Sequence, residues 1–238
     1  MRVFVAGAAG AIGRQLVPML IRAGHVVTGT TRSAERAAWL RSQGAQAVVV
    51  DVLDADALRA AVVDAGPQVV IHQLTDLAAG FGVEQLRANA RLRQVGTRNL
   101  MDAAVAARAT RMIAQSGAWL YAPGPEPHAE HDPLLDPTIV PDHPVLPGII
   151  ELERIVTSTP GVDGLVLRYG FLYGPDTEGT DPADGPTVHV VAAADAAARA
   201  VHRGSPGIYN VVDDGGSVSN ERARQVLGWQ PTYESDRW

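Results

Sequence analysis

Three glycines close to the N-terminus have the spacing of a phosphate-binding turn. Gly7, Gly10 and Gly13 follow an apolar stretch at 3–6 and open an amphipathic stretch typical of a helix. Such glycines permit a tight turn and a close approach of a pyrophosphate, whose charge the free N–H groups of the helix start can bind. The pattern predicts a dinucleotide-binding turn, with a purely structural Gly/Ala-rich turn as the alternative. The residues assigned to this turn are Gly7, Gly10, Ala11, Ile12 and Gly13.

The end of the second predicted strand indicates which dinucleotide is preferred. An NAD site usually has an acidic residue here, which holds the 2′-hydroxyl of the ribose. This chain has Thr31, Arg32 and Ser33 instead, and Arg14 stands just after the third glycine. A guanidinium group and hydroxyls suit a 2′-phosphate. We therefore predict NADP as the cofactor and leave NAD open, because Arg32 in the alternative interpretation is a solvated residue at a helix start.

Composition excludes several kinds of chemistry. The 238 residues include no cysteine and no lysine. Disulfides, thiolate nucleophiles, Cys-ligated zinc and every mechanism based on a lysine amine are therefore excluded. The formal charge of −6 argues against nucleic acid or an anionic membrane as a partner. No apolar run reaches the roughly 18 residues of a membrane span, and a strand begins directly after Met1. We therefore expect a cytoplasmic protein with a small-molecule substrate.

Apolar, β-branched runs alternate with amphipathic stretches, which is typical of βαβ units. The runs predict strands at 3–6, 25–30, 46–50, 68–72, 111–115, 164–169 and 207–212. The amphipathic stretches predict helices near 12–23, 34–43, 55–65, 83–107, 147–158 and 192–202. Asp54 is a candidate N-cap, and Gly24 and Gly44 are candidate helix ends. The predicted fold class is α/β, with the doubly wound parallel sheet of a Rossmann fold.

Two segments interrupt this alternation. Residues 122–148 hold eight of the sixteen prolines and three of the seven histidines, which predicts a long ordered loop or lid. Residues 174–186 are rich in Gly, Pro and Asp. Both follow strands of the second half, at the edge where open α/β sheets bind ligands. We divide the chain into a Rossmann core with its lid at 1–175 and, in the same domain, a much reduced substrate-binding part with the last sheet and helix elements at 176–238.

Several motifs carry a resemblance to a known family. They are the glycine turn, Asp51-Val52, the run Gly96-Thr97-Arg98-Asn99-Leu100, the run from Leu167 to Pro175, and shorter matches at 207–211 and 227–231. Together they resemble the extended short-chain dehydrogenases/reductases, the NAD-dependent epimerase/dehydratases. This resemblance implies a Rossmann core with a nicotinamide cofactor. The contacts that it implies are Asp51 and Val52 near the adenine, His72, Gln73 and Leu74 beside the ribose and phosphates, and Phe171 and Leu172 near the nicotinamide.

The chain departs from this family at the residues that move protons. The resemblance implies a Ser and a Tyr-x-x-x-Lys pair, in which the lysine lowers the tyrosine pKa. Aligning that motif, and the Glu usually found behind it, on Glu153 places Val145 at the tyrosine and Ile149 at the lysine. Neither side chain can move a proton. The serine position falls on Ser116 or on Gly117 beside it. We therefore predict an atypical member of the family with a rewired site.

A replacement for the lost tyrosine must come from the strand ends or from the lid. Ser116 and Tyr121 are our candidate catalytic residues, because both lie near the end of the fifth predicted strand. Histidines and a further tyrosine are held in reserve as general acids, with core packing or solvation as the alternative for each. The reserve residues are His128, His131, His143 and Tyr169. No metal site is predicted, because the two histidines of the H-x-x-H motif lack helical i, i+4 spacing and any partner motif.

The long helix predicted at 83–107 carries four arginines. They are Arg87, Arg91, Arg93 and Arg98. We interpret this charge run as a solvated helix face, with an anionic partner as the alternative. The helix packs along a subunit or domain surface in the family that the chain resembles, which leaves a homodimer open as a further partner.

The function that the sequence favours is an NADP(H)-dependent oxidoreductase of the epimerase/dehydratase type. Its substrate would be a small organic carbonyl or alcohol, with a proton relay from Ser116, Tyr121 or a lid histidine. Two alternatives stay open. One is a non-redox isomerase, lyase or cyclase on the same fold, and the other is a nucleotide-binding protein without catalysis.

Overall fold

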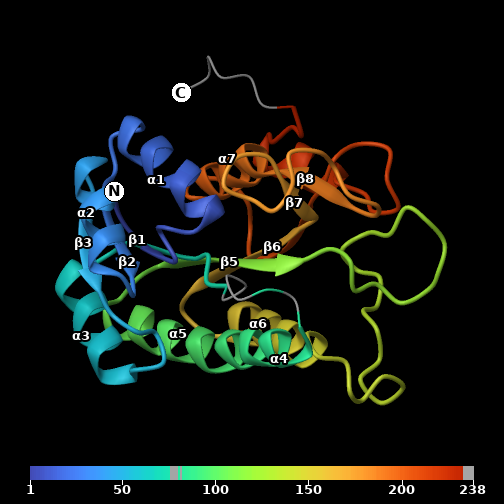
Figure 1. Cartoon of the computed structure of the whole chain (residues 1–238), viewed down its shortest axis with the longest axis horizontal. Helices are drawn as coiled ribbons and strands as arrows, with labels where there is room; N and C mark the ends of the chain where they lie inside the picture. Colours follow the sequence, from blue (N-terminus) through green and yellow to red (C-terminus); the bar gives the residue numbers. More distant parts are fainter. Residues whose placement is uncertain (76–79, 81, 233–238) are drawn as a thin grey trace.

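A seven-stranded sheet forms the centre of the molecule (Figure 1). The computed structural model describes residues 1–75, 80 and 82–232. Neighbouring strands of this sheet are all parallel, in the order β3-β2-β1-β4-β5-β6-β9. The strands are β1 (Arg2–Ala6), β2 (Val26–Thr31), β3 (Gln46–Val49), β4 (Val69–His72), β5 (Arg111–Gly117), β6 (Asp163–Tyr169) and β9 (Gly207–Val211).

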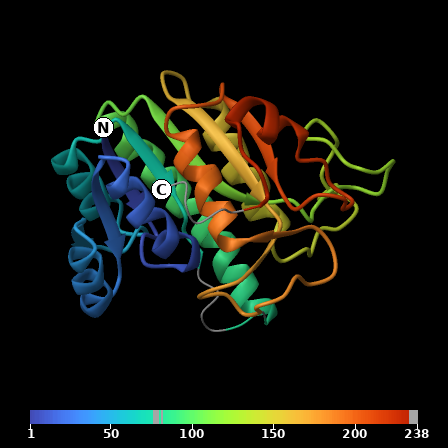
Figure 2. The ribbon, with the colours of Figure 1, turned by 90° about the horizontal axis from the view of Figure 1, so that it is seen from above.

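Helices cover both faces of the sheet (Figures 1 and 2). α1 and α7 pack together on one face, and α3, α5 and α6 lie on the other. The helices are α1 (Ala11–Arg22), α2 (Ala34–Ser42), α3 (Ala55–Ala65), α4 (Val83–Arg91), α5 (Thr97–Ala106), α6 (Leu146–Ser158) and α7 (Val190–Ala200), with π-helical turns η1 (Leu92–Gly96) and η2 (Ala223–Leu227). No helix among the described residues is long and apolar enough to cross a membrane.

The strands are continuous apolar runs because both of their faces are buried. In β1, Val3 and Val5 join the core below α1 and α7, while Phe4 and Ala6 join the core against α3 and α5. This alternation follows from the two-residue period of a strand. The α/β fold class predicted from the sequence is confirmed, and every predicted strand and helix is present with ends shifted by at most two residues.

Local signals set the helix ends as predicted. The Asp54 carboxylate accepts a hydrogen bond from the Ala57 N–H at 3.1 Å and caps α3. Gly24 and Gly44 follow α1 and α2 with φ of 80° and 88°, a left-handed conformation that glycine adopts without strain. These turns return the chain to the start of each next strand.

The strand order reverses between β1 and β4. From β1 the chain builds outward through β2 and β3, and from β4 it builds the other way through β5 and β6. Open α/β sheets bind ligands outside the carboxyl ends of the strands at such a reversal. The glycine turn follows β1 directly, so it lies at this point.

Some elements differ from the sequence prediction. β7 (Phe171–Tyr173) and β8 (Thr187–His189) form a separate two-stranded parallel sheet, which is absent from the predicted elements. Their three-residue length gives too short an alternation to be recognised. The helix predicted at 83–107 is interrupted by the π-helical turn η1. The irregular segment predicted at 174–186 connects β7 to β8.

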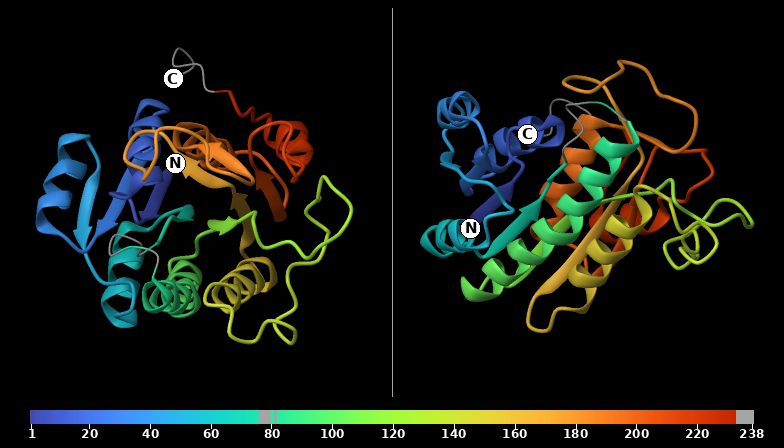
Figure 3. Two further views of the ribbon diagram at one scale, coloured as in Figure 1. Left: turned by 45° about the vertical axis from the view of Figure 1, so that its right-hand side comes forward. Right: turned by 60° about the horizontal axis from the view of Figure 1, so that its bottom comes forward.

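The proline-rich segment 122–148 lies at one end of the molecule (Figure 3). It is an ordered loop up to the start of α6, as predicted, and contains only isolated bridges, Tyr121 with Leu134 and His128 with Val218. The His128 N–H donates to the Ser217 carbonyl at 2.9 Å. These bonds hold the segment against the chain that follows β9.

Candidate active site

The glycine turn has one position that the protein itself leaves open. A Cβ on Gly7, where φ is 82°, would lie 2.4 Å from the Gln73 carbonyl oxygen, and one on Gly13 would lie 2.4 Å from that of Ala8. The fold therefore requires both glycines. Gly10 has φ of −81°, and the nearest atom to an added Cβ is 3.4 Å away. No packing contact explains a glycine there, whereas a ligand approaching the backbone would.

The start of α1 offers unpaired donors beside Gly10. Gly10 is the N-cap residue but provides no side-chain acceptor, and the first turn has no acidic residue. Arg14 N–H, which donates to the Gly10 carbonyl, begins the helical bonds. No described group accepts from the N–H groups of Ala11, Ile12 or Gly13. Such a helix start favours an anion through its free donors and its dipole.

Hydroxyl and guanidinium groups gather at the end of β2. The Thr31 hydroxyl accepts from the Ser33 N–H at 3.1 Å, and Ser33 caps α2. The guanidinium of Arg14 lies 5.0 Å above the centre of the Trp39 ring, which brings it to α2, and 4.0 Å from a carboxylate oxygen of Asp176. Arg32 is exposed beside them. The structure thus brings the predicted ribose-binding residues into one neighbourhood.

His72 and Gln73, which the resemblance assigns to the ribose and phosphates, lie at the end of β4. The buried His72 ring shares a hydrogen bond of 2.8 Å between Nε2 and the Thr97 hydroxyl, and Nδ1 accepts from the Leu74 N–H at 3.3 Å. Burial, with a smaller effect of the Arg93 charge, lowers the pKa of His72 to about 4. The ring is therefore neutral at pH 7.

Asp51 and Val52 follow β3 at the same edge of the sheet. Asp51 is exposed, and its carboxylate accepts from the Leu53 N–H at 2.9 Å. The Val52 carbonyl accepts from the Asn99 amide at 2.9 Å, and the Val52 side chain is buried. The Asn99 contact ties the run at 96–100, singled out in the sequence, to the residues after β3.

Aromatic rings occupy the rim where the sequence places the family serine. A Cβ on Gly117 would lie 2.7 Å from atoms of the Trp119 ring, so glycine is needed for this ring to fold over the end of β5. Trp119 stacks on Phe171 with 4.7 Å between ring centres. Leu172 is partly buried and follows Phe171 in β7. The rim is apolar and lies beside the residues assigned to the nicotinamide.

Val145 and Ile149 are part of an apolar cluster at the start of α6. Ile149 is fully buried and Val145 nearly so, and they pack with Leu120 and Leu146. Trp119 packs against the same cluster. No group that can give up a proton stands at either position, and the chain has no lysine to supply one from elsewhere.

Ser116 and Tyr121 belong to one buried polar network. The Ser116 hydroxyl donates to the Glu153 carboxylate at 2.7 Å, and the Arg168 guanidinium donates to both oxygens of that carboxylate at 2.8 and 2.6 Å. Arg168 also donates to the Tyr121 hydroxyl at 2.8 Å, and this hydroxyl donates to the side-chain amide oxygen of Asn210 at 2.7 Å. The network links β5, α6, β6 and β9.

The charges within this network stabilise one another. Burial opposes the charge of Arg168, but its bonds to Glu153 raise the guanidinium pKa above its usual value. Burial also raises the pKa of Tyr121, against the opposing effect of Arg168. Tyr121 is therefore protonated at neutral pH, and its hydroxyl is held between a donor and an acceptor.

The four residues held in reserve as general acids lie in different surroundings. His128 stacks on the Tyr121 ring with 5.1 Å between ring centres. His131 has an exposed side chain. The Nδ1 atom of His143 accepts from two backbone N–H groups at the start of α6, at 3.3 and 3.1 Å. Tyr169 is buried, its hydroxyl accepts from the Gln73 amide at 3.4 Å, and burial raises its pKa. Of these four residues, only His128 has a side-chain contact with one of the candidate catalytic residues Ser116 and Tyr121.

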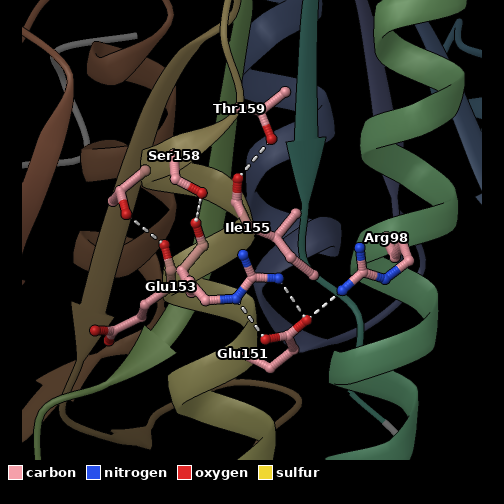
Figure 4. A network of polar contacts seen from close by, with 8 residues as sticks. Arg98, Glu151, Glu153, Ile155, Ser158 and Thr159 are labelled. Carbon is pink, nitrogen blue, oxygen red and sulfur yellow. Dashed lines mark hydrogen bonds and ion pairs between the residues drawn. The ribbon is translucent and has the colours of Figure 1, made fainter.

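Of the four arginines predicted to form a solvated helix face, three are exposed and one is buried. Arg87, Arg91 and Arg98 are exposed, and Arg98 pairs with Glu151 on α6, which also binds Arg154 (Figure 4). Figure 4 also shows Glu153 pointing away from Glu151. Arg93 is only 3% exposed, so the solvated interpretation is wrong for it. A helix turns by about 100° per residue, so the side chain of Arg93 lies about 200° around the helix axis from that of Arg91 and points inward.

Similarity to known proteins identifies the family. Residues 3–200 match the NAD-dependent epimerase/dehydratase family. The chain is 36% identical to a 3-diazoavenalumate denitrifying reductase of a Streptomyces species, covering 100% of this chain and 98% of that one. That alignment has 303 positions for a chain of 238 residues, so about 65 positions of the relative have no counterpart here.

A second relative is similar over part of its length, and a solved structure shares the fold. A 4-hydroxy-2-methyl-3-oxo-4-farnesyl-3,4-dihydroquinoline-1-oxide ketoreductase of Stigmatella aurantiaca is 29% identical over 74% of this chain and 52% of that one. The UDP-glucose 4-epimerase of Thermus thermophilus, solved with NAD, has the same fold, with a TM-score of 0.76 and 23% identity over 98% of this chain and 86% of that one. The chain is an enzyme of the epimerase and oxidoreductase type and belongs to the NAD-dependent epimerase/dehydratase family.

Proposed function

We propose that this enzyme is an NADPH-dependent reductase of a small organic substrate. The observation that carries the proposal is the open space at Gly10 beside three unpaired N–H groups, because a pyrophosphate fits the two features together. Gly7 to Gly13 would hold the pyrophosphate, and Phe171 and Leu172 would flank the nicotinamide. Bound NADPH supplies a hydride. The protein supplies orientation and an apolar rim that excludes water.

NADPH is the proposed form of the cofactor because of the groups at the end of β2. Arg14 and Arg32 would bind the 2′-phosphate, with Thr31 and Ser33 beside them. We expect NADPH to bind about ten- to a hundredfold more tightly than NADH, since a charge-assisted contact contributes about 1.5–3 kcal/mol. Titration of both cofactors into the wild type and Arg32→Ala measures this. Arg36→Ala, an exposed arginine on α2, is the control.

Loss of the NADPH preference is expected in Arg32→Ala alone. Equal affinities for the two cofactors in the wild type would contradict the proposed preference. An unchanged preference in Arg32→Ala would remove Arg32 from the site.

Apolar side chains stand at the two positions where the family has its proton-donating tyrosine and lysine. This favours a hydride acceptor that needs no proton. A ketone that receives a hydride becomes an alkoxide and needs a proton from the site. Val145, Ile149 and the Trp119 ring over Gly117 cannot give one. An arenediazonium carbon that receives a hydride needs no proton. The C–N bond breaks as the C–H bond forms, and N₂ leaves with the electron pair of the C–N bond.

We therefore propose a diazo- or diazonium-substituted aromatic compound as the substrate class. The name of the Streptomyces relative, a denitrifying reductase of a diazo compound, supports this class. Trp119 and Phe171 provide an aromatic surface at the rim. Incubation with NADPH and a panel of arenediazonium carboxylates should release N₂ and the reduced arene. Reduction of ketones but of no diazonium compound would contradict the proposed class.

The buried network favours a second candidate, reduction of a carbonyl group. Ser116 and Tyr121 are joined through Glu153 and Arg168, and the charged Arg168 guanidinium, which donates to the Tyr121 hydroxyl, would stabilise the phenolate left when Tyr121 gives its proton to the substrate. The ketoreductase among the relatives supports this candidate. In it, Tyr121 would be the acid and Ser116 would position Glu153.

Variants of the network separate the two candidates. If the protein reduces carbonyl groups, Tyr121→Phe should lower kcat about a hundredfold or more, since a general acid contributes that much, and Ser116→Ala should lower it less. For hydride transfer to a diazonium carbon, Tyr121→Phe should leave kcat within a few-fold of the wild type. The kcat values of both variants on both substrate classes decide between them. Full activity of both variants on ketones would refute the role of Tyr121 as the acid.

A further inference from the structure

Arg93 is a buried cation with no counter-ion among the residues that the structure describes. The residue is 3% exposed, its Nε atom is enclosed without a hydrogen bond, and no described side chain forms an ion pair with it. Arg168, the other described arginine that is buried to this degree, has Glu153 as its partner. Burial lowers the pKa of Arg93 to about 10, so the guanidinium is still charged at pH 7. An isolated buried charge strongly disfavours folding and is seldom retained without a function.

The topology places Arg93 at the ligand-binding edge of the sheet. α5 starts near the carboxyl ends of the strands and leads to the start of β5, so it runs antiparallel to them. Thr97, at its first turn, bonds to His72, the last residue of β4. Arg93 lies four residues earlier, on the same helix face, and so about 6 Å further toward the edge. That position is just beyond the end of β4.

The groups around Arg93 do not neutralise it. His72 is neutral, and Gln73, which follows it, has an amide oxygen that is also buried without a hydrogen bond. Arg93 belongs to the π-helical turn η1, and such turns occur frequently at functional sites. Two unsatisfied polar atoms therefore flank the end of β4, next to the turn that carries Gly7.

We propose that the guanidinium of Arg93 binds a carboxylate group of the substrate. A guanidinium and a carboxylate match in geometry, because two parallel N–H donors meet two oxygens. The α1 start already provides donors for the cofactor phosphates, which leaves Arg93 for another anion. The substrate in the name of the Streptomyces relative is itself an organic acid anion. The inference rests on the proposed function, since it specifies the substrate of the same site.

Binding of unreactive acids tests the proposal without turnover. The probes are benzoate, phenylacetate and cinnamate, each compared with its neutral amide, and they are titrated into the enzyme saturated with NADP⁺. We expect the wild type to bind at least one acid tenfold or more tightly than its amide, from one charge-assisted pair. Arg93→Met should reduce that ratio to about one, and Arg93→Lys should retain part of it. Arg91→Met, an exposed neighbour, is the control and should keep the full ratio.

Stability and cofactor affinity distinguish other roles. Arg93→Met should unfold at the same temperature as the wild type or higher, because it removes a buried charge. No preference for any acid in the wild type, or an unchanged preference in Arg93→Met, would overturn the proposal. If Arg93→Met loses tenfold in NADPH affinity but keeps the preference for acids, Arg93 binds the cofactor rather than a substrate carboxylate, and the proposal is also overturned. The probes do not react, so their binding is measured independently of turnover. An enzyme that prefers the acids but shows no reductase activity would therefore refute the proposed function and leave the role of Arg93 intact.

Discussion

Gly10→Val is expected to abolish NADPH binding while the protein still folds. Gly10 has a backbone conformation that valine can adopt, and an added Cβ meets nothing closer than 3.4 Å. The branched side chain would project into the space assigned to the pyrophosphate. We expect the affinity for NADPH to fall about a hundredfold or more, since several charge-assisted contacts with the α1 start are lost together. Calorimetric titration measures the affinity, and circular dichroism measures folding.

Two further variants make this result specific. Gly216→Val changes a glycine with no neighbour within 4 Å of an added Cβ, and it should bind NADPH like the wild type. Gly13→Val should fail to fold, because its Cβ would overlap the Ala8 carbonyl. A folded Gly10→Val protein that keeps wild-type affinity for NADPH would remove the glycine turn from the cofactor site.

Arg168→Met is expected to cause the largest loss of stability in the site. It leaves the Glu153 carboxylate buried, with the Ser116 hydroxyl as its one remaining partner among the described residues. Breaking a buried ion pair by removing one partner costs about 3–5 kcal/mol. For a domain of this size the unfolding midpoint should fall on the order of 10 °C. Thermal unfolding followed by circular dichroism measures this change.

A double variant tests whether the loss comes from the uncompensated charge. Glu153→Leu combined with Arg168→Met replaces both ions by apolar side chains and should recover much of the stability. Arg154→Met breaks an exposed pair on the other side of α6 and should leave the midpoint close to that of the wild type. If Arg168→Met and Arg154→Met unfold at the same temperature, the buried network does not hold the strand ends together.

Much of the fold could be predicted from local patterns. The β1 sequence is apolar throughout because both of its faces are buried, and the glycines after α1 and α2 end those helices by conformation alone. The glycine turn could be located for the same reason, since strand, turn and helix follow one another directly in the chain. β7 and β8 were missed because each is three residues long and pairs across a 13-residue connection.

The site depends on contacts between distant residues, which a sequence pattern does not contain. The partner of Ser116 is 37 residues away on α6, and Tyr121 meets Asn210 across 89 residues. That Trp119 covers Gly117 follows from a ring orientation that only packing determines. The inward position of Arg93 had a signal, its offset of two residues from Arg91, but a run of four arginines suggested one face.

The central claim, that a nicotinamide cofactor carries out a reduction here, is tested most directly by the stoichiometry of the reaction. The absorbance of NADPH is followed while the product formed from an arenediazonium carboxylate is quantified in the same sample. We predict that one NADPH is oxidised for each arene that is reduced and each N₂ that is released. When the transferred hydrogen of the cofactor is replaced by deuterium, the deuterium should be found on the ring carbon that carried the N₂ group. Product formed at the full rate with no change in NADPH would contradict the account and favour a non-redox reaction on this fold.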